Sequence, residues 1–593
     1  MLLKTLTKSI REYKKASILS PIFVAFEVVL EVAIPFIMSM LVDYMQKNES
    51  NLNINTIIMY GGILLVLAML SLLFGFLAGK YCAEASTGFA KNLRKDMFYA
   101  IQDYSFTNID KFSTSSLVTR MTTDITNVQM AYMLVIRTAI RAPLMIIFAL
   151  IMSFTINTYL ALIFLIMVPL IATGLILIFK KTHPIFIKVF KKYDKLNNTV
   201  QENVRGIRTV KSFVREDYET EKFKKSSNDI KEDFIVAEKI LSFNNPLMNF
   251  AIYCTTLIIS LLGSMVIVNS LDGTVAFKFG QLSTGQLSSL ITYTTQILMS
   301  LMMVSMIVVM ITMSITSAER ICEVLNEKSD LTNPENPIME VKNGDIEFKN
   351  VNFSYCGSED KLSLKNINLK LKSGQTLGII GGTGSSKSTL VSLIPRLYDT
   401  SDGEVLVGDI NVKDYDIETL RNNVAMVLQK NVLFSGTIKE NLRWGNENAT
   451  DEELIEAAKL AQADSFIQTF PDKYDTFIEQ GGTNVSGGQK QRLCIARALL
   501  KKPKILILDD STSAVDTKTD ALIRKAMKEN IPNTTKIIIA QRTSSVMDAD
   551  LICVLDRGKI CGLGTHEELL KTNAIYQEVY YSQNRIGGDN NEK

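Results

Sequence analysis

Two adjacent carboxylates are the residues of this sequence that most directly suggest chemistry. Asp509 and Asp510 end the apolar run KILILDD, residues 504–510. One acid at the end of a buried strand commonly holds a metal ion, whereas an acid beside it can act as a general base. A base must reach the reacting water, so the length of the second side chain decides whether it can act.

A glycine-rich loop lies upstream of these acids. Residues 381–389 read GGTGSSKST and directly follow the apolar run LGII. Backbone N–H groups of such a loop surround phosphate oxygens at a helix N-terminus. In the pattern G-x-x-x-x-G-K-[ST], the lysine contacts the β and γ phosphates and the hydroxyl reaches Mg²⁺, which assigns these roles to Lys387 and Ser388. The predicted ATP-binding residues of the loop are Gly381, Gly382, Thr383, Gly384, Ser385, Ser386, Lys387, Ser388 and Thr389.

The loop departs from the pattern at Ser386, where glycine is expected. Serine is tolerable at this position if its backbone already has helical dihedrals, and the sequence leaves the local geometry open. The alternative is a glycine-rich turn that binds no nucleotide. Strand, loop and helix nevertheless follow one another in the order that nucleotide binding requires.

A second motif identifies a family. The segment NVSGGQKQRLCIARALL, residues 484–500, precedes the strand that ends in the two acids. This half of the chain resembles the nucleotide-binding domain of an ATP-binding-cassette (ABC) transporter, with VSGGQ in the place of the LSGGQ signature. In that family each ATP lies between the P-loop of one domain and the signature of the other. The resemblance implies that the partner's ATP is contacted by Ser486, Gly487, Gly488 and Gln489.

The resemblance assigns further roles in the soluble half. Tyr355 matches the aromatic residue that stacks on adenine, with a core aromatic as the alternative. Gln429 matches the Q-loop glutamine that contacts Mg²⁺ and signals to the membrane domain, and residues 511–516 resemble the D-loop. Asp509 matches the aspartate that orders Mg²⁺. The implied magnesium ligands are Ser388, Gln429 and Asp509.

Three positions depart from the family pattern. Asp510 stands where the catalytic glutamate is expected, and its shorter side chain places the carboxylate about 1 Å short, which can cost on the order of a hundredfold in rate. Gln541 replaces the switch histidine and cannot share a proton as imidazole can. Gln480 replaces a usual acid. With an intact signature, the chain resembles the degenerate-site subunit of bacterial heterodimeric ABC exporters.

The first half of the chain is predicted to span a membrane. Hydrophobic residues make up 47% of the 593 residues and concentrate in the first 320 positions. About 20 apolar residues are needed to cross the hydrocarbon core. The predicted spans are 17–44, 56–80, 131–155, 158–180, 247–270 and 286–317.

The distribution of lysine and arginine predicts the orientation. Basic residues crowd the segment before the first span and residues 81–130 and 181–245, whereas the other linkers hold only Lys47 and Lys278. The positive-inside rule then places both termini in the cytoplasm, and the first span has no features of a cleaved signal. A net charge of +3 gives no reason to expect a nucleic-acid partner. Seven scattered cysteines suit a reducing compartment without a metal cluster.

The expected fold class is an α-helical six-span transmembrane domain of the type IV ABC exporter fold, followed by an α/β P-loop nucleotide-binding domain. The expected divisions are 1–320 for the transmembrane domain, 321–344 for a linker, 345–585 for the nucleotide-binding domain and 586–593 for a polar tail. Residues 91–129 and 201–217 resemble the two intracellular loops of the exporters. By analogy, coupling helices are expected near 115–122 and 205–213.

Two features of the spans bear on cargo. Span six carries a stripe of methionines at helical spacing, which suits either helix packing or a surface for varied apolar ligands. The stripe consists of Met299, Met302, Met303, Met306, Met310 and Met313. Glu27 and Glu31 share one helix face, as do Arg137 and Arg141, so we expect an intrasubunit ion-pair ladder, with a cation-recognising acidic site as the rival.

The sequence therefore predicts one half of an ATP-driven heterodimeric exporter in a bacterial cytoplasmic membrane. The implied partners are a second half-transporter with a consensus catalytic site, membrane lipid, and an amphipathic drug, lipid or peptide as cargo. The alternatives are a sensor that reports a bound peptide or drug to signalling proteins, and a homodimeric exporter with two weak sites. No peptidase segment precedes the first span, so we expect no cleavage of leader peptides by this chain.

Overall fold

The computed structural model describes residues 2–48, 52–271, 281–355, 361–511 and 513–584. The chain divides into two compact units. The membrane unit comprises residues 1–102 and 113–327, and the ATPase unit comprises residues 103–112 and 328–593. The ATPase unit thus includes a ten-residue segment from within the membrane half of the sequence.

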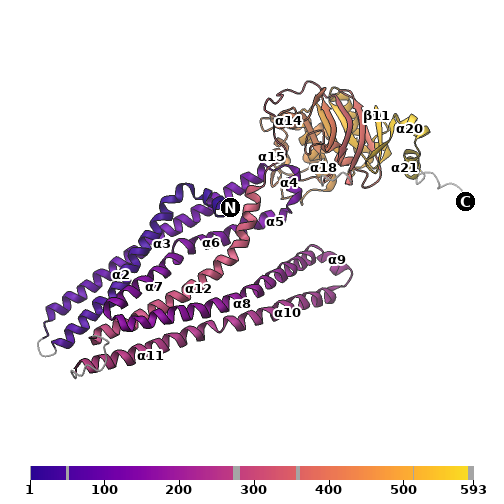
Figure 1. Ribbon diagram of the computed structural model, residues 1–593. Helices are drawn as coiled ribbons and strands as arrows, with labels where there is room; N and C mark the ends of the chain where they lie inside the picture. The colour runs from indigo at the N-terminus through magenta and orange to yellow at the C-terminus, as the bar shows by residue number, and fades with distance from the viewer. Residues whose placement is uncertain (1, 49–51, 272–280, 356–360, 512, 585–593) are drawn as a thin grey trace. The chain divides into compact units, whose positions relative to one another are not determined.

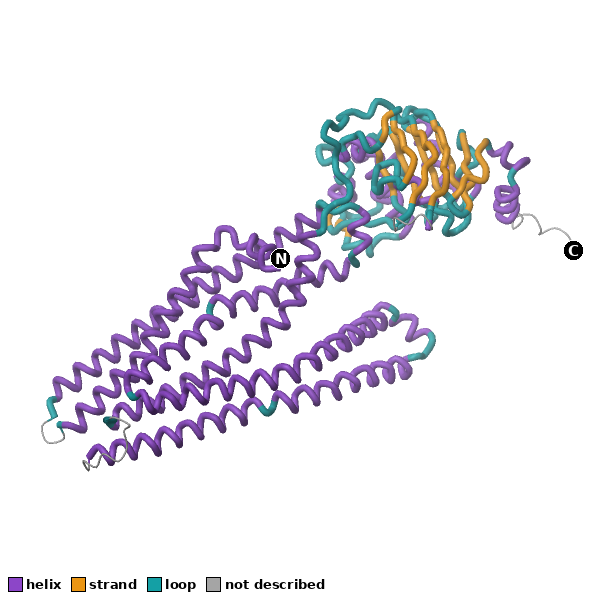
Figure 2. Tube along the Cα trace, in the orientation of Figure 1, coloured by secondary structure: helices purple, strands orange, loops and turns teal. Residues whose placement is uncertain are grey.

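The membrane unit consists of helices joined by short connections in its described residues (Figures 1 and 2). Its elements are α1 (Leu2–Thr7), η1 (Lys8–Tyr13), α2 (Lys14–Lys47), α3 (Ile54–Gln102), α5 (Thr114–Thr119), η2 (Arg120–Asp124), α6 (Ile125–Ile136), α7 (Thr138–Ile156), α8 (Thr158–Arg205), α9 (Ile207–Ser212), α10 (Glu216–Leu241), α11 (Asn244–Leu271) and α12 (Thr284–Asn326). Long helices α8 and α10 run side by side and are joined through the short α9 (Figure 1). Lys278 lies outside the described residues.

The prediction of six membrane spans is confirmed. Six helical stretches of the described chain are long and apolar enough to cross a membrane. Five predicted spans lie entirely within one stretch each, whereas the span 247–270 extends two residues beyond Val268, the end of the fifth stretch. They are Leu2–Lys47, Ile54–Gln102, Thr114–Ile156, Thr158–Arg205, Glu216–Val268 and Thr284–Asn326. The most apolar window of α3 has no buried residue, which fits a helix whose side chains face lipid.

Polar groups inside this unit are satisfied by backbone carbonyls. The hydroxyl of Tyr293 on α12 donates to the carbonyl of Val32 on α2 at 2.8 Å, and the hydroxyl of Ser289 donates to the carbonyl of Pro35 at 2.6 Å. Proline has no N–H, so Pro35 within α2 leaves the carbonyl of Glu31 without its usual helical hydrogen bond. The two hydroxyl bonds fix the first and last spans against each other.

The ATPase unit contains two larger sheets. The antiparallel sheet has the order β2-β1-β4-β5 and the mainly parallel sheet has the order β12-β11-β3-β10-β9-β6. The strands are β1 (Ile346–Phe353), β2 (Leu364–Leu371), β3 (Thr376–Ile380), β4 (Asp402–Val407), β5 (Ile410–Asn411), β6 (Val424–Val427), β7 (Gly436–Thr437), β8 (Phe477–Ile478), β9 (Ile505–Asp509), β10 (Thr535–Ile539), β11 (Leu551–Asp556) and β12 (Lys559–Gly564). Strands β3 and β9 coincide with the two strands predicted from the sequence.

The helices of the ATPase unit surround these sheets (Figure 2). They are α4 (Phe106–Lys111), α13 (Lys387–Ser392), α14 (Ile417–Asn423), α15 (Ile438–Arg443), α16 (Asp451–Leu460), α17 (Asp464–Ile467), η4 (Lys473–Asp475), α18 (Gly487–Leu500), α19 (Thr517–Asn530), η5 (Thr543–Ser545), α20 (His566–Thr572) and α21 (Ala574–Asn584). The expected polar tail, 586–593, lies outside the described residues.

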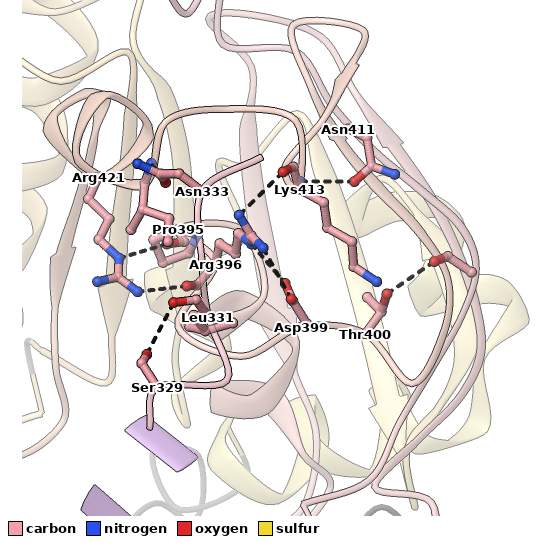
Figure 3. A network of polar contacts seen from close by, with 12 residues as sticks. Ser329, Leu331, Asn333, Pro395, Arg396, Asp399, Thr400, Asn411, Lys413 and Arg421 are labelled. Carbon is pink, nitrogen blue, oxygen red and sulfur yellow. Dashed lines mark hydrogen bonds and ion pairs between the residues drawn. The ribbon is translucent and has the colours of Figure 1, made fainter. Parts of the chain in front are cut away.

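The segment after α12 is bound along the ATPase unit. Helix α12 continues to Asn326, a few residues into the expected linker. Farther on, Asn333 donates from Nδ2 to a carboxylate oxygen of Asp416 at 2.6 Å, and Ile338 forms a β-bridge with Tyr415. Figure 3 shows part of this surface beside a turn that is held by Arg396 and Arg421. The segment is therefore an ordered part of the ATPase unit.

The first expected coupling helix is misplaced. Residues 115–122 form α5 and the start of η2, which belong to the membrane unit, where buried Arg120 pairs with Glu323 of α12 at 2.8 Å. The short helix that contacts the ATPase unit is α4, where the hydroxyl of Tyr398 donates to Asp110 at 2.7 Å. The ion pair of Arg120 with Glu323 ties residues 115–122 to α12. The sequence pattern alone did not indicate this contact. The second expected helix, near 205–213, corresponds to α9, and its docking remains a prediction.

The charged residues within the spans form ion pairs through Arg141. Its guanidinium lies 3.1 Å from Oε1 of Glu27 and 2.7 Å from Oε1 of Glu31. Glu27 is only 6% exposed, and α3 makes room for its carboxylate at Gly75, where a Cβ would lie 3.2 Å from Oε1. The predicted ion pairing is confirmed for Arg141. Within the described residues no ion pair forms at Arg137, so the ladder has one cation at its centre.

We predict that Arg141→Leu will destabilise the membrane unit by about 3 kcal/mol, because it leaves a buried carboxylate without its cation. Arg137→Leu, which removes the same charge one helical turn away, should cost much less. The midpoints of thermal unfolding of both variants in detergent micelles test this difference. Equal losses would show that the ion pairs at Glu27 and Glu31 contribute nothing beyond the total charge.

Candidate ATP-binding site

The parallel sheet brings the glycine-rich loop and the acid pair to one edge. Strand β10 lies between β3 and β9 and is parallel to both. Ile539 of β10 is in register with Ile379 of β3 and with Asp509 of β9. The residues that follow these three strands therefore emerge together, which is where ligands bind in open α/β sheets.

The glycine-rich loop wraps around the lysine side chain. The Nζ of Lys387 donates to the carbonyls of Gly381 at 2.8 Å and Gly382 at 2.9 Å. Position 381 requires glycine, because a Cβ there would clash with the carbonyl of Leu555. Burial lowers the pKa of Lys387, and nearby Asp509 opposes this shift. The ammonium group is thus held where incoming phosphate oxygens can replace the carbonyls.

Ser386 does not have the helical dihedrals that would make serine tolerable at this position. It caps α13 with φ of 72° and ψ of 29°, in the left-handed region. Glycine adopts this conformation freely, whereas a residue with a Cβ pays roughly 1 kcal/mol or more for it. The chain therefore keeps the backbone shape of a glycine at this position and accepts strain. Gly384, with φ of 80°, occupies a similar region without this cost.

Asp509 has the surroundings of a metal-ordering carboxylate. It is 4% exposed at the end of β9, and burial raises its pKa, while a hydrogen bond from Ser388 opposes the shift. The described residues hold no group of three or more His, Cys, Asp and Glu able to bind a metal by themselves. A carboxylate and a hydroxyl fit Mg²⁺, which binds few protein ligands and takes phosphate oxygens and water for the rest.

Asp510 is held by two neutral amides. Its Oδ2 accepts hydrogen bonds from Nε2 of Gln541 at 2.8 Å and from Nε2 of Gln429 at 3.4 Å. Its backbone has φ of 48°, and its N–H donates to the carbonyl of Ile539 at 3.0 Å. The structure thus brings the base position, the switch position and the Q-loop glutamine together. Neither amide can accept the proton that a general base must pass on.

The segment at Gln541 is also held from the C-terminal helix, a feature that sequence reasoning missed. The side-chain amide of Gln583 on α21 donates to the carbonyl of Gln541 at 2.8 Å and accepts from the N–H of Thr543 at 2.9 Å. It also accepts from the hydroxyl of Thr543 at 3.0 Å. No local pattern marks a lone glutamine near the end of a chain, so only the tertiary structure reveals this bond.

The signature residues form a regular helix start. Ser486 caps α18, with its hydroxyl accepting from the N–H of Gln489 and its own N–H donating to the Gln489 side chain. A Cβ at Gly488 would lie 2.8 Å from the carbonyl of Ala514 in the D-loop segment. Thr512 of the expected D-loop lies outside the described residues. The cap occupies the N–H of Gln489, and the other N–H groups of the first turn and the helix dipole favour a phosphate at this N-terminus.

Tyr355 is partly available for stacking. Its side chain is 47% exposed, and its hydroxyl lies 3.0 Å from the hydroxyl of Thr389 on α13. Its ring packs edge-on against Phe353 and Tyr398. A purely core aromatic would be covered on all sides, so this exposure favours the predicted role next to a purine base. Contact with adenine remains a prediction.

Family models match both units. The model of the ABC transporter transmembrane region matches residues 17–302, and the model of the ABC transporter domain matches residues 364–513. Such domains bind and hydrolyse ATP and generally use Mg²⁺. The arrangement of six apolar helices, a P-loop and a signature helix thus defines a membrane transporter driven by ATP.

Curated relatives extend this match over the whole chain. The uncharacterized ABC transporter ATP-binding protein YfiB of Bacillus subtilis is 37% identical over 88% of this chain and 89% of its own length. The putative ABC transporter ATP-binding protein MG014 of Mycoplasma genitalium is 32% identical over 99% of each chain. This chain belongs to the ABC transporter family.

A solved structure shares the fold. A bacterial Atm1-family ABC exporter with ATP bound superposes with a TM-score of 0.82 at 23% identity, covering 96% of this chain and 99% of that chain. The predicted exporter fold is therefore confirmed, and the chain is a multi-pass membrane protein with that fold. ABC exporters of this kind work as dimers of half-transporters.

We predict that Ser386→Gly will stabilise the ATPase unit by about 1 kcal/mol, because glycine removes the strain of the left-handed backbone. Ser385→Gly is the matched control. Ser385 is buried and has no left-handed backbone, so the same substitution should destabilise the unit. Thermal unfolding followed without nucleotide checks both variants, and a loss of stability in Ser386→Gly would contradict the strained loop.

Proposed function

We propose that this chain is the degenerate-site half of a heterodimeric ABC exporter that moves amphipathic drugs, lipids or peptides. Its own P-loop retains ATP with little turnover, while its signature completes the active site of a partner with a consensus base. The observation that carries this proposal is the contact between Asp510 and Gln541. A short carboxylate facing an amide replaces the longer base and the imidazole that the family pattern expects.

The residues of this chain's own site support binding more than hydrolysis. Lys387 and the loop amides bind the phosphates, and Mg²⁺, held by Ser388 and Asp509 with Gln429 nearby, would screen the phosphate charge. Asp510 is the group closest in type to a base, but its Oδ2 is already bonded to Gln541 and Gln429. Water near this carboxylate lacks a neighbour that can relay a proton, so turnover should be slow.

The signature on α18 supports a productive role at the other site. Ser486 and the N–H groups of Gly487, Gly488 and Gln489 start a well-capped helix. Donors fixed in this way stabilise charge that develops on a transferring phosphoryl group. A chain with a weak base and a sound signature is most useful opposite an unlike partner, and this favours a heterodimer over a homodimer with two weak sites.

Two features of the membrane unit bear on substrate and topology. The stripe on α12 leaves Met299, Met303, Met306 and Met313 exposed within one chain, which suits an adaptable apolar surface. The pairing of Glu27 and Glu31 with Arg141 weakens the case for an acidic site for cations.

We place both termini in the cytoplasm of a bacterial cell from the loop charges. The divisions at 320, 344 and 585 are kept as the proposed domain limits.

Composition of the assembled complex tests the heterodimer. The chain is isolated from membranes of the organism that carries it, and the complex is weighed by native mass spectrometry. One copy of this chain with one different half-transporter supports the proposal. Two copies of this chain would overturn it in favour of the homodimer. Transport of a fluorescent amphipath by the reconstituted complex separates an exporter from a sensor, which would bind the probe without moving it.

We predict that, in the heterodimer, Asp510→Ala will lower steady-state ATPase activity less than twofold, whereas Ser486→Phe will abolish most of it. The first change affects a site with little turnover, and the second removes a contact to the partner's γ-phosphate, for which losses of about a hundredfold are typical.

Thr450→Phe is the control for Ser486→Phe. Thr450 caps α16 with the same reciprocal bonds that Ser486 makes on α18, but it lies outside the signature. Loss of a cap alone costs about 1 kcal/mol, so this variant should keep its ATPase activity. Full activity in Ser486→Phe, or no activity in Asp510→Ala, would refute the asymmetric assignment.

Restoring the family residues should have the opposite effect. We predict that Asp510→Glu together with Gln541→His will raise hydrolysis at this chain's own site at least about tenfold, since a positioned base contributes about a hundredfold or more. Single-turnover assays with the partner's base removed isolate this site. Each single substitution should raise the rate of hydrolysis at this site only slightly. An unchanged rate in the double variant would mean that another defect limits the site.

A further inference from the structure

A cluster of aromatic side chains connects the nucleotide loop with α4. Tyr355 touches α13 through the hydroxyl of Thr389 at 3.0 Å. The Tyr355 ring meets that of Tyr398 at a centroid distance of 5.2 Å and an interplanar angle of 90°. Tyr398 then meets Phe106 of α4 at 6.0 Å, also edge-on. Edge-to-face aromatic pairs at such distances attract and have a preferred orientation.

Tyr398 adds a directed bond to these ring contacts. Its hydroxyl donates to Oδ2 of Asp110 on α4 at 2.7 Å. Burial and this hydrogen bond both raise the pKa of Tyr398, so the hydroxyl keeps its proton and remains a donor at neutral pH. A bond to a carboxylate is stronger than one between neutral groups. A shift of the Tyr398 ring therefore cannot occur without moving Asp110 or breaking this bond.

Side-chain hydrogen bonds hold the turn that carries Tyr398, and Figure 3 shows those made by Arg396 and Arg421. Arg396 is 5% exposed and binds both carboxylate oxygens of Asp399, at 2.8 and 3.2 Å. Arg421 donates to the carbonyls of Pro395 at 3.3 Å and Arg396 at 2.8 Å. The main chain on both sides of Tyr398 is thus fixed, so movement at Tyr398 is limited to its side chain.

Helix α4 is anchored at its start as well. Ser105 and Asn108 form a capping box, and Nδ2 of Asn108 donates to the carbonyl of Lys328 at 3.1 Å. The flanking residues, Gln102 and Ser113, belong to the membrane unit. The helix is therefore a short segment of the transmembrane half of the sequence that is held within the ATPase unit by Asn108 at its start and by Phe106 and Asp110, which both contact Tyr398.

We infer that Tyr398 is a positioning residue that transmits occupancy of this chain's own ATP site to α4, along the path Thr389, Tyr355, Tyr398 and Asp110. A purine base that stacks on the exposed face of Tyr355 restricts that ring, and the edge-on contact passes the restriction to Tyr398 and its bond with Asp110. The inference rests on the proposed retention of ATP at this site. On this path, ATP that is bound but little hydrolysed still has an effect, because its presence alone changes the contacts of α4.

Hydrogen exchange of α4 tests the path. The full chain in lipid nanodiscs is compared with and without Mg²⁺ and a non-hydrolysable ATP analogue, and exchange of residues 105–112 is followed by mass spectrometry. We expect the analogue to slow exchange of this segment in the native chain. Tyr398→Phe should reduce that nucleotide effect by about fivefold, the net contribution of one hydrogen bond, without loss of analogue binding.

Two further variants separate transmission from general damage. Tyr474→Phe is the matched control, since the Tyr474 hydroxyl donates to Asp464 at 2.8 Å within the same unit but away from α4, and it should keep the full nucleotide effect. Asp110→Asn retains an acceptor for Tyr398 and should largely preserve the effect, whereas Asp110→Ala should lose it.

The outcomes distinguish this inference from the function on which it rests. An unchanged nucleotide effect in Tyr398→Phe, or equal losses in Tyr398→Phe and Tyr474→Phe, would overturn the path. Rapid ATP hydrolysis at this chain's own site would instead overturn the degenerate-site proposal. That result leaves the exchange experiment readable, because the analogue is bound and not hydrolysed.

Discussion

The shared strand β10 is the constraint on which the ATPase site depends. Because β3 and β9 pair in parallel with opposite sides of β10, the glycine-rich loop, the acid pair and the segment at Gln541 all leave the sheet at the same edge. The buried apolar side chains of these strands leave little freedom of register. Residues far apart in sequence can therefore meet within hydrogen-bonding distance.

This shared edge explains how Asp510 and Gln541, the two departures from the family pattern in the site, come into contact. A shorter carboxylate and an amide are each ordinary on a protein surface, but here Gln541 donates directly to Asp510 and satisfies its charge. The pair is therefore well matched as a hydrogen bond and poorly suited to moving a proton. Both departures from the family pattern thus act on one contact, the bond from Gln541 to Asp510.

The sequence predicted the strands and motifs of this site. It did not predict the backbone conformation of Ser386 or the tertiary hydrogen bonds of α4. The strand ends, the P-loop and the signature were predictable because apolar runs and glycines mark them locally. The left-handed backbone of Ser386 was not, since a serine before a helix normally signals an ordinary cap. The identity of α4 was equally hidden, because the bonds of Asn108 to Lys328 and of Asp110 to Tyr398 join residues more than 200 positions apart.

The membrane unit illustrates the same limit in another way. Equal spacing of Glu27 with Glu31 and of Arg137 with Arg141 predicted two facing pairs of charges. In the structure, one guanidinium serves both acids. Arg137 lies in the break between α6 and α7, with φ of −117° and ψ of −69°, whereas Arg141 lies one turn farther on, within α7, and no periodicity could reveal this break.

The bond between Gln583 and the segment at Gln541 has a practical side. Gln583 lies one residue before the end of α21, so the bond that holds the loop beside Asp510 is close to the last described residue of the chain. An affinity tag, fluorescent protein or surface tether fused at the C-terminus is therefore attached near this bond along the chain. An N-terminal fusion is attached far from it along the chain, so preparations that differ only in which terminus carries the fusion need not be equivalent at this loop.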